Sequence, residues 1–169
     1  MAAVMAASSV AGFTGCGNKA GEQTVAEEKK TVKDYGLTEN VKDGAILQCF
    51  CWSFNTIRES MEDIAAAGYS SIQTSPINAV YDGGNAGMQL FGDGKWSYIY
   101  QPTDWTIGNY QLGTEEEFKK MCSVAESYGI KVIVDVVPNH TTTATDEVSD
   151  DFIKAVGGKD KLYHSKGMT

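Results

Sequence analysis

The sequence holds few of the residues from which metal clusters are built. Its 169 residues include two histidines and four cysteines. Two of these cysteines form the triplet Cys49-Phe50-Cys51, whose spacing differs from the C-x-x-C of zinc and thioredoxin sites. This composition argues against a Cys/His metal cluster. We expect Cys49 and Cys51 to pack on one face of a strand as small hydrophobic side chains.

Basic residues and long apolar runs are also scarce. The chain carries 14 lysine and arginine residues against 22 acidic ones, a net charge of -8, which argues against nucleic acid or an anionic membrane surface as a partner. No stretch approaches the roughly 20 apolar residues of a membrane-spanning helix. A hydrophobic content of 42% nevertheless excludes a wholly disordered chain. The length allows one domain or part of a larger one.

The first segment, residues 1–22, has the composition of an export signal. Met1–Gly15 contains no charged residue and ends directly before Cys16. This arrangement resembles a bacterial lipoprotein signal, in which the cysteine is lipidated, although no Lys or Arg precedes the apolar run. The alternative is a tail in which Cys16 has no such role. The lipoprotein interpretation predicts an extracellular or cell-surface protein whose residues 23–43 form a polar tether.

A strand–helix–strand pattern follows the tether. Residues 45–52 form a short, nearly continuous apolar run, as expected for a strand that is buried on both faces. Thr56–Glu59 has the Ser/Thr-x-x-Glu spacing of a capping box, and it predicts an amphipathic helix that ends near Gly68. Residues 71–74 are predicted to form a second strand.

The same pattern recurs further along the chain. Thr114–Glu117 is a second capping box, Gly129 suits the end of the helix that it opens, and residues 130–134 form a third apolar strand. Strands that alternate with helices pair in parallel through right-handed crossovers. The predicted fold class is therefore α/β, and the pattern is the beginning of either a doubly wound sheet or a TIM (β/α)8 barrel.

Two features favour the barrel. No Gly-x-Gly-x-x-Gly segment follows the first strand, so the phosphate loop of a dinucleotide fold is missing. The segment between the second strand and the second helix, residues 76–113, is much longer than the roughly 2–6 residues of a compact connection. This segment follows the carboxyl end of a strand, which is where barrel enzymes build their sites.

The long segment is rich in side chains that suit a sugar ligand. Sugar rings stack on aromatic faces, while amides and carboxylates bind the hydroxyl groups. The alternative is that the aromatic side chains only cover the mouth of the barrel. The residues concerned are Phe91, Asp93, Trp96, Tyr98, Tyr100, Gln101, Asp104, Trp105 and Tyr110.

A second polar group, Asp-Val-Val-Pro-Asn-His at residues 135–140, follows the third strand. Asn139 offers a neutral oxygen that suits Ca²⁺, and His140 can donate a hydrogen bond or act as an acid or base. By residue type alone, Asp135 is a candidate general base with His140 as its partner. A stiff structural turn around Pro138 is the alternative, and the residue types do not separate the two.

Two motifs together carry a resemblance to a known family. Val-Ile-Val-Asp-Val-Val-Pro-Asn-His at 132–140 and Lys-Trp-Ser-Tyr-Ile-Tyr-Gln-Pro at 95–102 resemble the α-amylase family, glycoside hydrolase family 13. The resemblance implies that residues 44–140 are the first three βα units of a TIM (β/α)8 barrel. It also implies that residues 141–169 begin the domain that is inserted after the third strand.

The resemblance implies a role for each motif residue. His140 resembles the histidine that hydrogen-bonds the sugar at the cleavage point, and Tyr100 resembles the tyrosine that stacks on that sugar. Trp96 and Gln101 resemble residues that contact the substrate. Asp135 resembles an acid that supports the active-site network, which replaces the general-base hypothesis.

The resemblance also implies a cofactor and a reaction. Asn139 resembles a ligand of a structural Ca²⁺ that ties the barrel to the inserted domain. The family hydrolyses α-glucans with retention, using carboxylates on the fourth, fifth and seventh strands, none of which lies within these 169 residues. We therefore expect an N-terminal fragment, inactive by itself, of an enzyme that cleaves internal α-1,4-glucosidic bonds in starch or glycogen. The alternatives are a non-catalytic surface lipoprotein that binds glucan, or an inert gene remnant.

A barrel that stops after three strands has an open parallel edge, and its interior side chains lack partners. We expect Cys49, Cys51, Ile72 and Val134 to face the barrel interior. We also expect the chain alone to be insoluble or molten.

Overall fold

The computed structural model describes residues 34–83 and 95–162, all of which belong to the second of two units, Val32–Thr169. The predictions for Cys16, for the signal-like segment 1–22, for most of the tether and for Phe91 and Asp93 lie outside the described residues. No helix in the described ranges is both long and apolar enough to cross a membrane.

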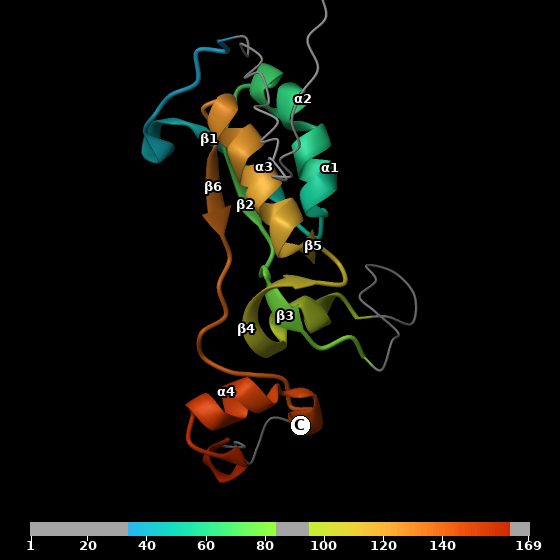
Figure 1. Cartoon of the computed structure of the whole chain (residues 1–169). Coiled ribbons are helices and arrows are strands. Elements are labelled where there is room, and N and C mark those ends of the chain that lie inside the picture. Colours follow the sequence, from blue (N-terminus) through green and yellow to red (C-terminus); the bar gives the residue numbers. More distant parts are fainter. Residues whose placement is uncertain (1–33, 84–94, 163–169) are drawn as a thin grey trace, which may run out of the picture. The chain divides into compact units, whose positions relative to one another are not determined.

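The described unit contains a three-stranded parallel sheet (Figure 1). Its strands are β1 (Ala45–Cys49), β2 (Tyr69–Thr74) and β6 (Lys131–Val134), in the order β1-β2-β6. The predicted parallel pairing is therefore confirmed. The pairing brings the strand ends into register, because Cys49 lies opposite Thr74 and Thr74 lies opposite Val134.

The second predicted capping box is confirmed. It opens α3 (Glu115–Ser127): the Thr114 hydroxyl oxygen accepts the Glu117 N–H at 3.3 Å, and the Glu117 carboxylate accepts the Thr114 N–H at 2.8 Å. Gly129 follows the helix with a φ of 72°, a conformation that glycine adopts without a steric cost. Both helix ends therefore lie where the sequence indicates.

The first predicted capping box is wrong. Its helix starts three residues earlier as α1 (Phe54–Glu59), because the extended backbone of Ser53 places its hydroxyl to accept the Thr56 N–H at 3.1 Å. The single predicted helix is also two helices, because the backbone at Ser60 leaves the helical conformation before α2 (Met61–Ala66) begins.

The core lies between the parallel sheet and the helices. Cys49 and Ile72 are fully buried in one cluster with helix residues, which include Phe54, Ile57, Met61 and Met121. The prediction that Cys49, Ile72 and Val134 face the barrel interior is therefore wrong, since the register puts all three on the helix-covered side. The opposite side carries the aligned residues Gln48, Gln73 and Ile133.

The first strand is shorter and more exposed than predicted. It ends at Cys49, and Ile46 is 45% exposed, because β1 pairs only with β2 in the part of the chain that the structure describes. Cys51 follows the strand with a left-handed φ of 61°. It is buried, as expected, but it does not share a strand face with Cys49.

The long segment between β2 and α3 contains a second, antiparallel sheet. Its strands are β3 (Asn78–Val80), β4 (Pro102–Asn109) and β5 (Gly113–Thr114), and a 3-10 helix, Trp96–Tyr100, precedes β4. The chain after β6 returns to the edge of β4, where the Thr142 and Ser149 N–H groups donate to the Pro102 and Thr103 carbonyl oxygens at 2.9 Å each.

The last described elements follow this contact. They are the 3-10 turn Thr145–Glu147, the helix α4 (Asp150–Ala155) and the 3-10 turn Lys159–Lys161. Ser149 caps α4 by accepting the Phe152 N–H at 3.1 Å. The Phe152 ring packs against the Trp105 ring with centroids 6.2 Å apart, so α4 lies on the second sheet.

Candidate functional site

The carboxyl edge of the parallel sheet gathers the residues that the sequence singles out. Because Cys49, Thr74 and Val134 lie in register, the residues that follow them, Phe50 and Asp135 among these, project at one edge. The 3-10 helix Trp96–Tyr100 reaches the same edge through its contacts with these two residues. Open α/β sheets and barrels both bind ligands at this edge.

Tyr100 and Asp135 form the central contact of the site. The Tyr100 hydroxyl lies close enough to the Asp135 carboxylate for the two groups to interact: burial first, and then this carboxylate, raises the pKa of Tyr100. A phenol whose pKa is raised stays protonated at neutral pH, so it remains a donor.

An aromatic cluster borders this contact. The Trp96 ring lies edge-on to the Tyr100 ring, with centroids 6.2 Å apart and an interplanar angle of 81°, and it lies 6.3 Å from the Phe50 ring. Trp96 is 53% exposed, so a large part of its surface faces solvent. The exposed Trp96 ring, next to the half-buried Tyr100 and Asp135 side chains, provides an apolar surface for a ligand that has flat C–H faces.

His140 and Gln101 complete the cluster. The Nε2 atom of His140 lies 3.0 Å from the Tyr100 carbonyl oxygen, and because a carbonyl only accepts, this nitrogen carries the proton and donates. The ring is exposed, which leaves its Nδ1 atom for a ligand. Gln101 adjoins Tyr100 in the chain, and its side-chain oxygen accepts a hydrogen bond from Thr142 at 3.1 Å.

The predicted substrate-binding residues and Asp135 thus lie in one place. They are linked by the contacts described above and, for Gln101, by its place next to Tyr100 in the chain. Up to 44 positions separate them in the sequence, from 96 to 140. The residues are Trp96, Tyr100, Gln101, Asp135 and His140. An exposed aromatic surface with amide, imidazole and phenol groups at its margin can bind a neutral polyhydroxylated ligand. The site contains no second carboxylate beside Asp135 in the described contacts.

Comparison with known proteins identifies the family. The family model of the α-amylase catalytic domain matches residues 53–164 of the chain. The chain belongs to the α-amylase family. It is 53% identical over 152 residues to an α-amylase of Butyrivibrio fibrisolvens, an alignment that covers 88% of this chain and 16% of that protein. It is 42% identical over 135 residues to an α-amylase of Clostridium acetobutylicum, covering 78% of this chain and 17% of the relative.

Solved structures of the same family show the fold. The chain is similar to the crystal structure of α-amylase I from Eisenia fetida with a TM-score of 0.52 and 27% identity, over 59% of this chain and 18% of that one. A second structure of that enzyme, a mutant in complex with maltohexaose, matches with a TM-score of 0.52 and 26% identity. The described unit is therefore the first three βα units of a TIM barrel, and the chain spans about a sixth of the length of its curated relatives.

Asn139, the predicted calcium ligand of this α-amylase family chain, lies exposed on the turn after β6. Its amide oxygen is a suitable ligand, but Ca²⁺ takes about 6–8 oxygen ligands. No group of three or more His, Cys, Asp or Glu residues that suits a metal ion occurs in the described ranges.

Ser75 and Gln111, which belong to no motif in the sequence, support the site through their contacts with Cys51. Cys51 donates its N–H to the Ser75 hydroxyl at 2.9 Å, and its carbonyl accepts from the Gln111 side chain at 2.8 Å. These bonds hold the left-handed backbone that turns the chain at the carboxyl end of β1. Burial raises the pKa of the Cys51 thiol, while the Ser75 hydrogen bond lowers it. No sequence pattern indicates a left-handed cysteine, so this support was not predictable.

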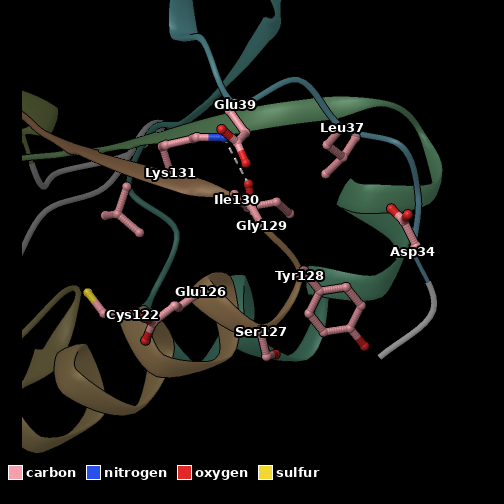
Figure 2. Close-up of a pocket in the computed structure, with 11 residues that line it drawn as sticks. Asp34, Leu37, Glu39, Cys122, Glu126, Ser127, Tyr128, Gly129, Ile130 and Lys131 are labelled. Atoms are coloured by element: carbon pink, nitrogen blue, oxygen red, sulfur yellow. Dashed lines mark hydrogen bonds between the residues drawn. The ribbon is translucent and has the colours of Figure 1, made fainter. Parts of the chain in front are cut away.

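A cavity of about 890 Å³ lies at the opposite end of the sheet. Figure 2 shows that Glu126 and Tyr128 at the end of α3 line it together with Lys131 at the start of β6. The Lys131 ammonium donates to the carbonyl oxygens of Thr38 at 2.8 Å and Gly129 at 3.2 Å. In a TIM barrel this end supports stability and the carboxyl end carries the chemistry, so the cavity is not the candidate active site.

Proposed function

We propose that this chain is the N-terminal part of a retaining α-glucan hydrolase of the α-amylase type, which cleaves internal α-1,4-glucosidic bonds in starch or glycogen. The observation that carries the proposal is the convergence of Trp96, Tyr100, Gln101, Asp135 and His140 at the carboxyl edge of the barrel strands. The naming of the relatives as α-amylases and the maltohexaose bound to a structural neighbour support a glucan as the ligand.

In this proposal the described residues bind and orient the sugar, and they do not break the bond. Tyr100 stacks on the sugar ring, and Asp135 holds the Tyr100 hydroxyl. Trp96 extends the apolar surface. His140 and Gln101 hydrogen-bond the sugar hydroxyls. Retaining hydrolysis needs two carboxyl groups about 5–5.5 Å apart across the scissile bond. In the α-amylase family these groups lie on barrel strands that follow the three strands described. The 169-residue chain by itself is therefore expected to have no hydrolytic activity.

A hybrid enzyme tests the proposal. The 152 matched residues of this chain replace their counterparts in the Butyrivibrio fibrisolvens α-amylase, which then supplies the catalytic carboxylates. We expect this hybrid amylase to release maltooligosaccharides from starch and to cleave an end-blocked maltoheptaoside, whereas the 169-residue chain alone does neither. A folded hybrid with no activity would refute the proposal, and the unmodified relative is the matched control.

The proposed enzyme also binds a structural calcium ion. We infer that Asn139 supplies one of several ligands to a structural Ca²⁺ and that the others come from residues outside the described ranges. Calorimetric titration of the hybrid amylase with CaCl₂ should show tighter binding than titration of its Asn139→Ala variant. Equal affinities would exclude Asn139 as a ligand.

A second candidate function rests on the exposed aromatic cluster. The surface of Trp96 is available to a glucan without any catalytic group nearby, which is the property of a glucan-binding surface protein. For both candidate functions, the hydrolase and the glucan-binding protein, we propose that the protein lies at the cell surface with Cys16 lipidated. Retention of the 169-residue chain on amylose resin would support binding without catalysis. A mass spectrum showing unmodified Cys16 with residues 1–15 still attached would exclude the lipid anchor.

A further inference from the structure

We propose that Thr142 is a positioning residue that fixes the orientation of the Gln101 side chain, so that Gln101 presents its N–H donors to a glucan. The proposal rests on the proposed function, since it concerns the substrate-binding role of Gln101. Thr142 is 2% exposed, and its hydroxyl lies 3.1 Å from Gln101 Oε1. The two residues are 41 positions apart in the sequence.

The hydrogen bonds around the Thr142 hydroxyl show which atom of the Gln101 amide faces it. A threonine hydroxyl has one proton to donate and two lone pairs that accept. The Ala144 N–H donates to this hydroxyl at 3.1 Å, so that contact uses a lone pair and leaves the hydroxyl proton. The structure places the amide oxygen of Gln101 at the hydroxyl, where it accepts this proton. The contact with Thr142 therefore holds the Gln101 amide through its oxygen.

The position of Thr142 is itself fixed. Its N–H donates to the Pro102 carbonyl oxygen at 2.9 Å, which anchors it to the first residue of β4 directly after Gln101. Burial prevents water from replacing the hydroxyl. The amide of Gln101 is consequently held through its oxygen, and its two N–H groups are what remains for a ligand.

This orientation has a consequence for recognition. A ligand atom that meets the N–H groups of Gln101 accepts a hydrogen bond, as the lone pairs of a glucan hydroxyl or ring oxygen do. An amide without the Thr142 contact can rotate to either orientation and presents the wrong atom part of the time. The Thr142 hydroxyl thus contributes to affinity through Gln101 and has no contact of its own with the sugar.

The test uses the hybrid amylase with a matched pair of substitutions. Thr142→Val keeps the shape and removes the hydroxyl, whereas Thr142→Ser keeps the hydroxyl and removes a methyl group. We expect Thr142→Val to raise KM for maltoheptaose about 3- to 10-fold, the size of one hydrogen bond, with kcat within twofold of the unsubstituted hybrid. Thr142→Ser should retain the KM of the unsubstituted hybrid, even if its thermal midpoint falls because of the lost methyl group.

A double substitution separates positioning from a general effect on packing. In a Gln101→Ala background, Thr142→Val should leave KM unchanged, because its partner is absent. The inference is overturned if Thr142→Val leaves KM unchanged or if Thr142→Ser raises KM as much as Thr142→Val does. It is also overturned if Thr142→Val raises KM equally with and without Gln101. An inactive unsubstituted hybrid would instead count against the proposed function, and the inference would then fall with it.

Discussion

Replacing Tyr100 by Phe removes the hydroxyl that interacts with the Asp135 carboxylate and keeps the ring, so it tests whether the two groups share a hydrogen bond that matters for activity. A hydrogen bond to a charged group contributes about 1.5–3 kcal/mol, and its loss also leaves Asp135 without this donor. If the bond holds the stacking ring and the carboxylate in their productive positions, Tyr100→Phe should lower kcat/KM of the hybrid amylase roughly 10- to 150-fold.

A double-mutant cycle with Asp135→Asn measures the bond itself. Either substitution breaks the charged hydrogen bond, so the double variant should lose little more than the worse single variant, and the coupling should be about 1.5–3 kcal/mol. Tyr98→Phe is the matched control, because Tyr98 lies in the same 3-10 helix and packs on Tyr81 instead. Additive effects of the two substitutions would refute the reasoning.

Two further predictions concern the fold that carries the site. Ser53→Ala should speed hydrogen exchange of the first-turn amides of α1 about fivefold, since a cap contributes about 1 kcal/mol. The control substitution Thr56→Ala should change this exchange rate little. Equal effects of the two substitutions would contradict the assignment of Ser53 as the cap. Burial raises the pKa of Cys49 from 9.0 to about 11. The neutral thiol therefore favours the folded state fully below pH 9, and this contribution is lost as the pH rises from 9 through 11. Peptide mass spectrometry after iodoacetamide treatment at pH 8 should find Cys49 unmodified in the folded hybrid, and rapid labelling would show that it is not buried.

Local features could be predicted from the sequence because all the atoms involved lie within one turn of chain. The capping box at Thr114–Glu117 is such a case, as is the left-handed glycine at Gly129. The first helix was placed wrongly because Ser53 and Thr56 are both good caps. Ser53 caps because Cys51, held by Ser75 and Gln111, turns the chain just before it.

The sequence by itself determined the family and the parallel pairing, because these depend on motifs and on periodicity along the chain, and the same motifs supplied the candidate site residues. It did not determine which side of the sheet meets the helices, since alternation defines two faces without saying which one is covered. The tertiary structure decided that Cys49 and Ile72 lie in the core. It also decided that Tyr100 lies beside Asp135 and that Thr142 bonds Gln101, because contacts between residues more than 30 positions apart form only when the strands are in register.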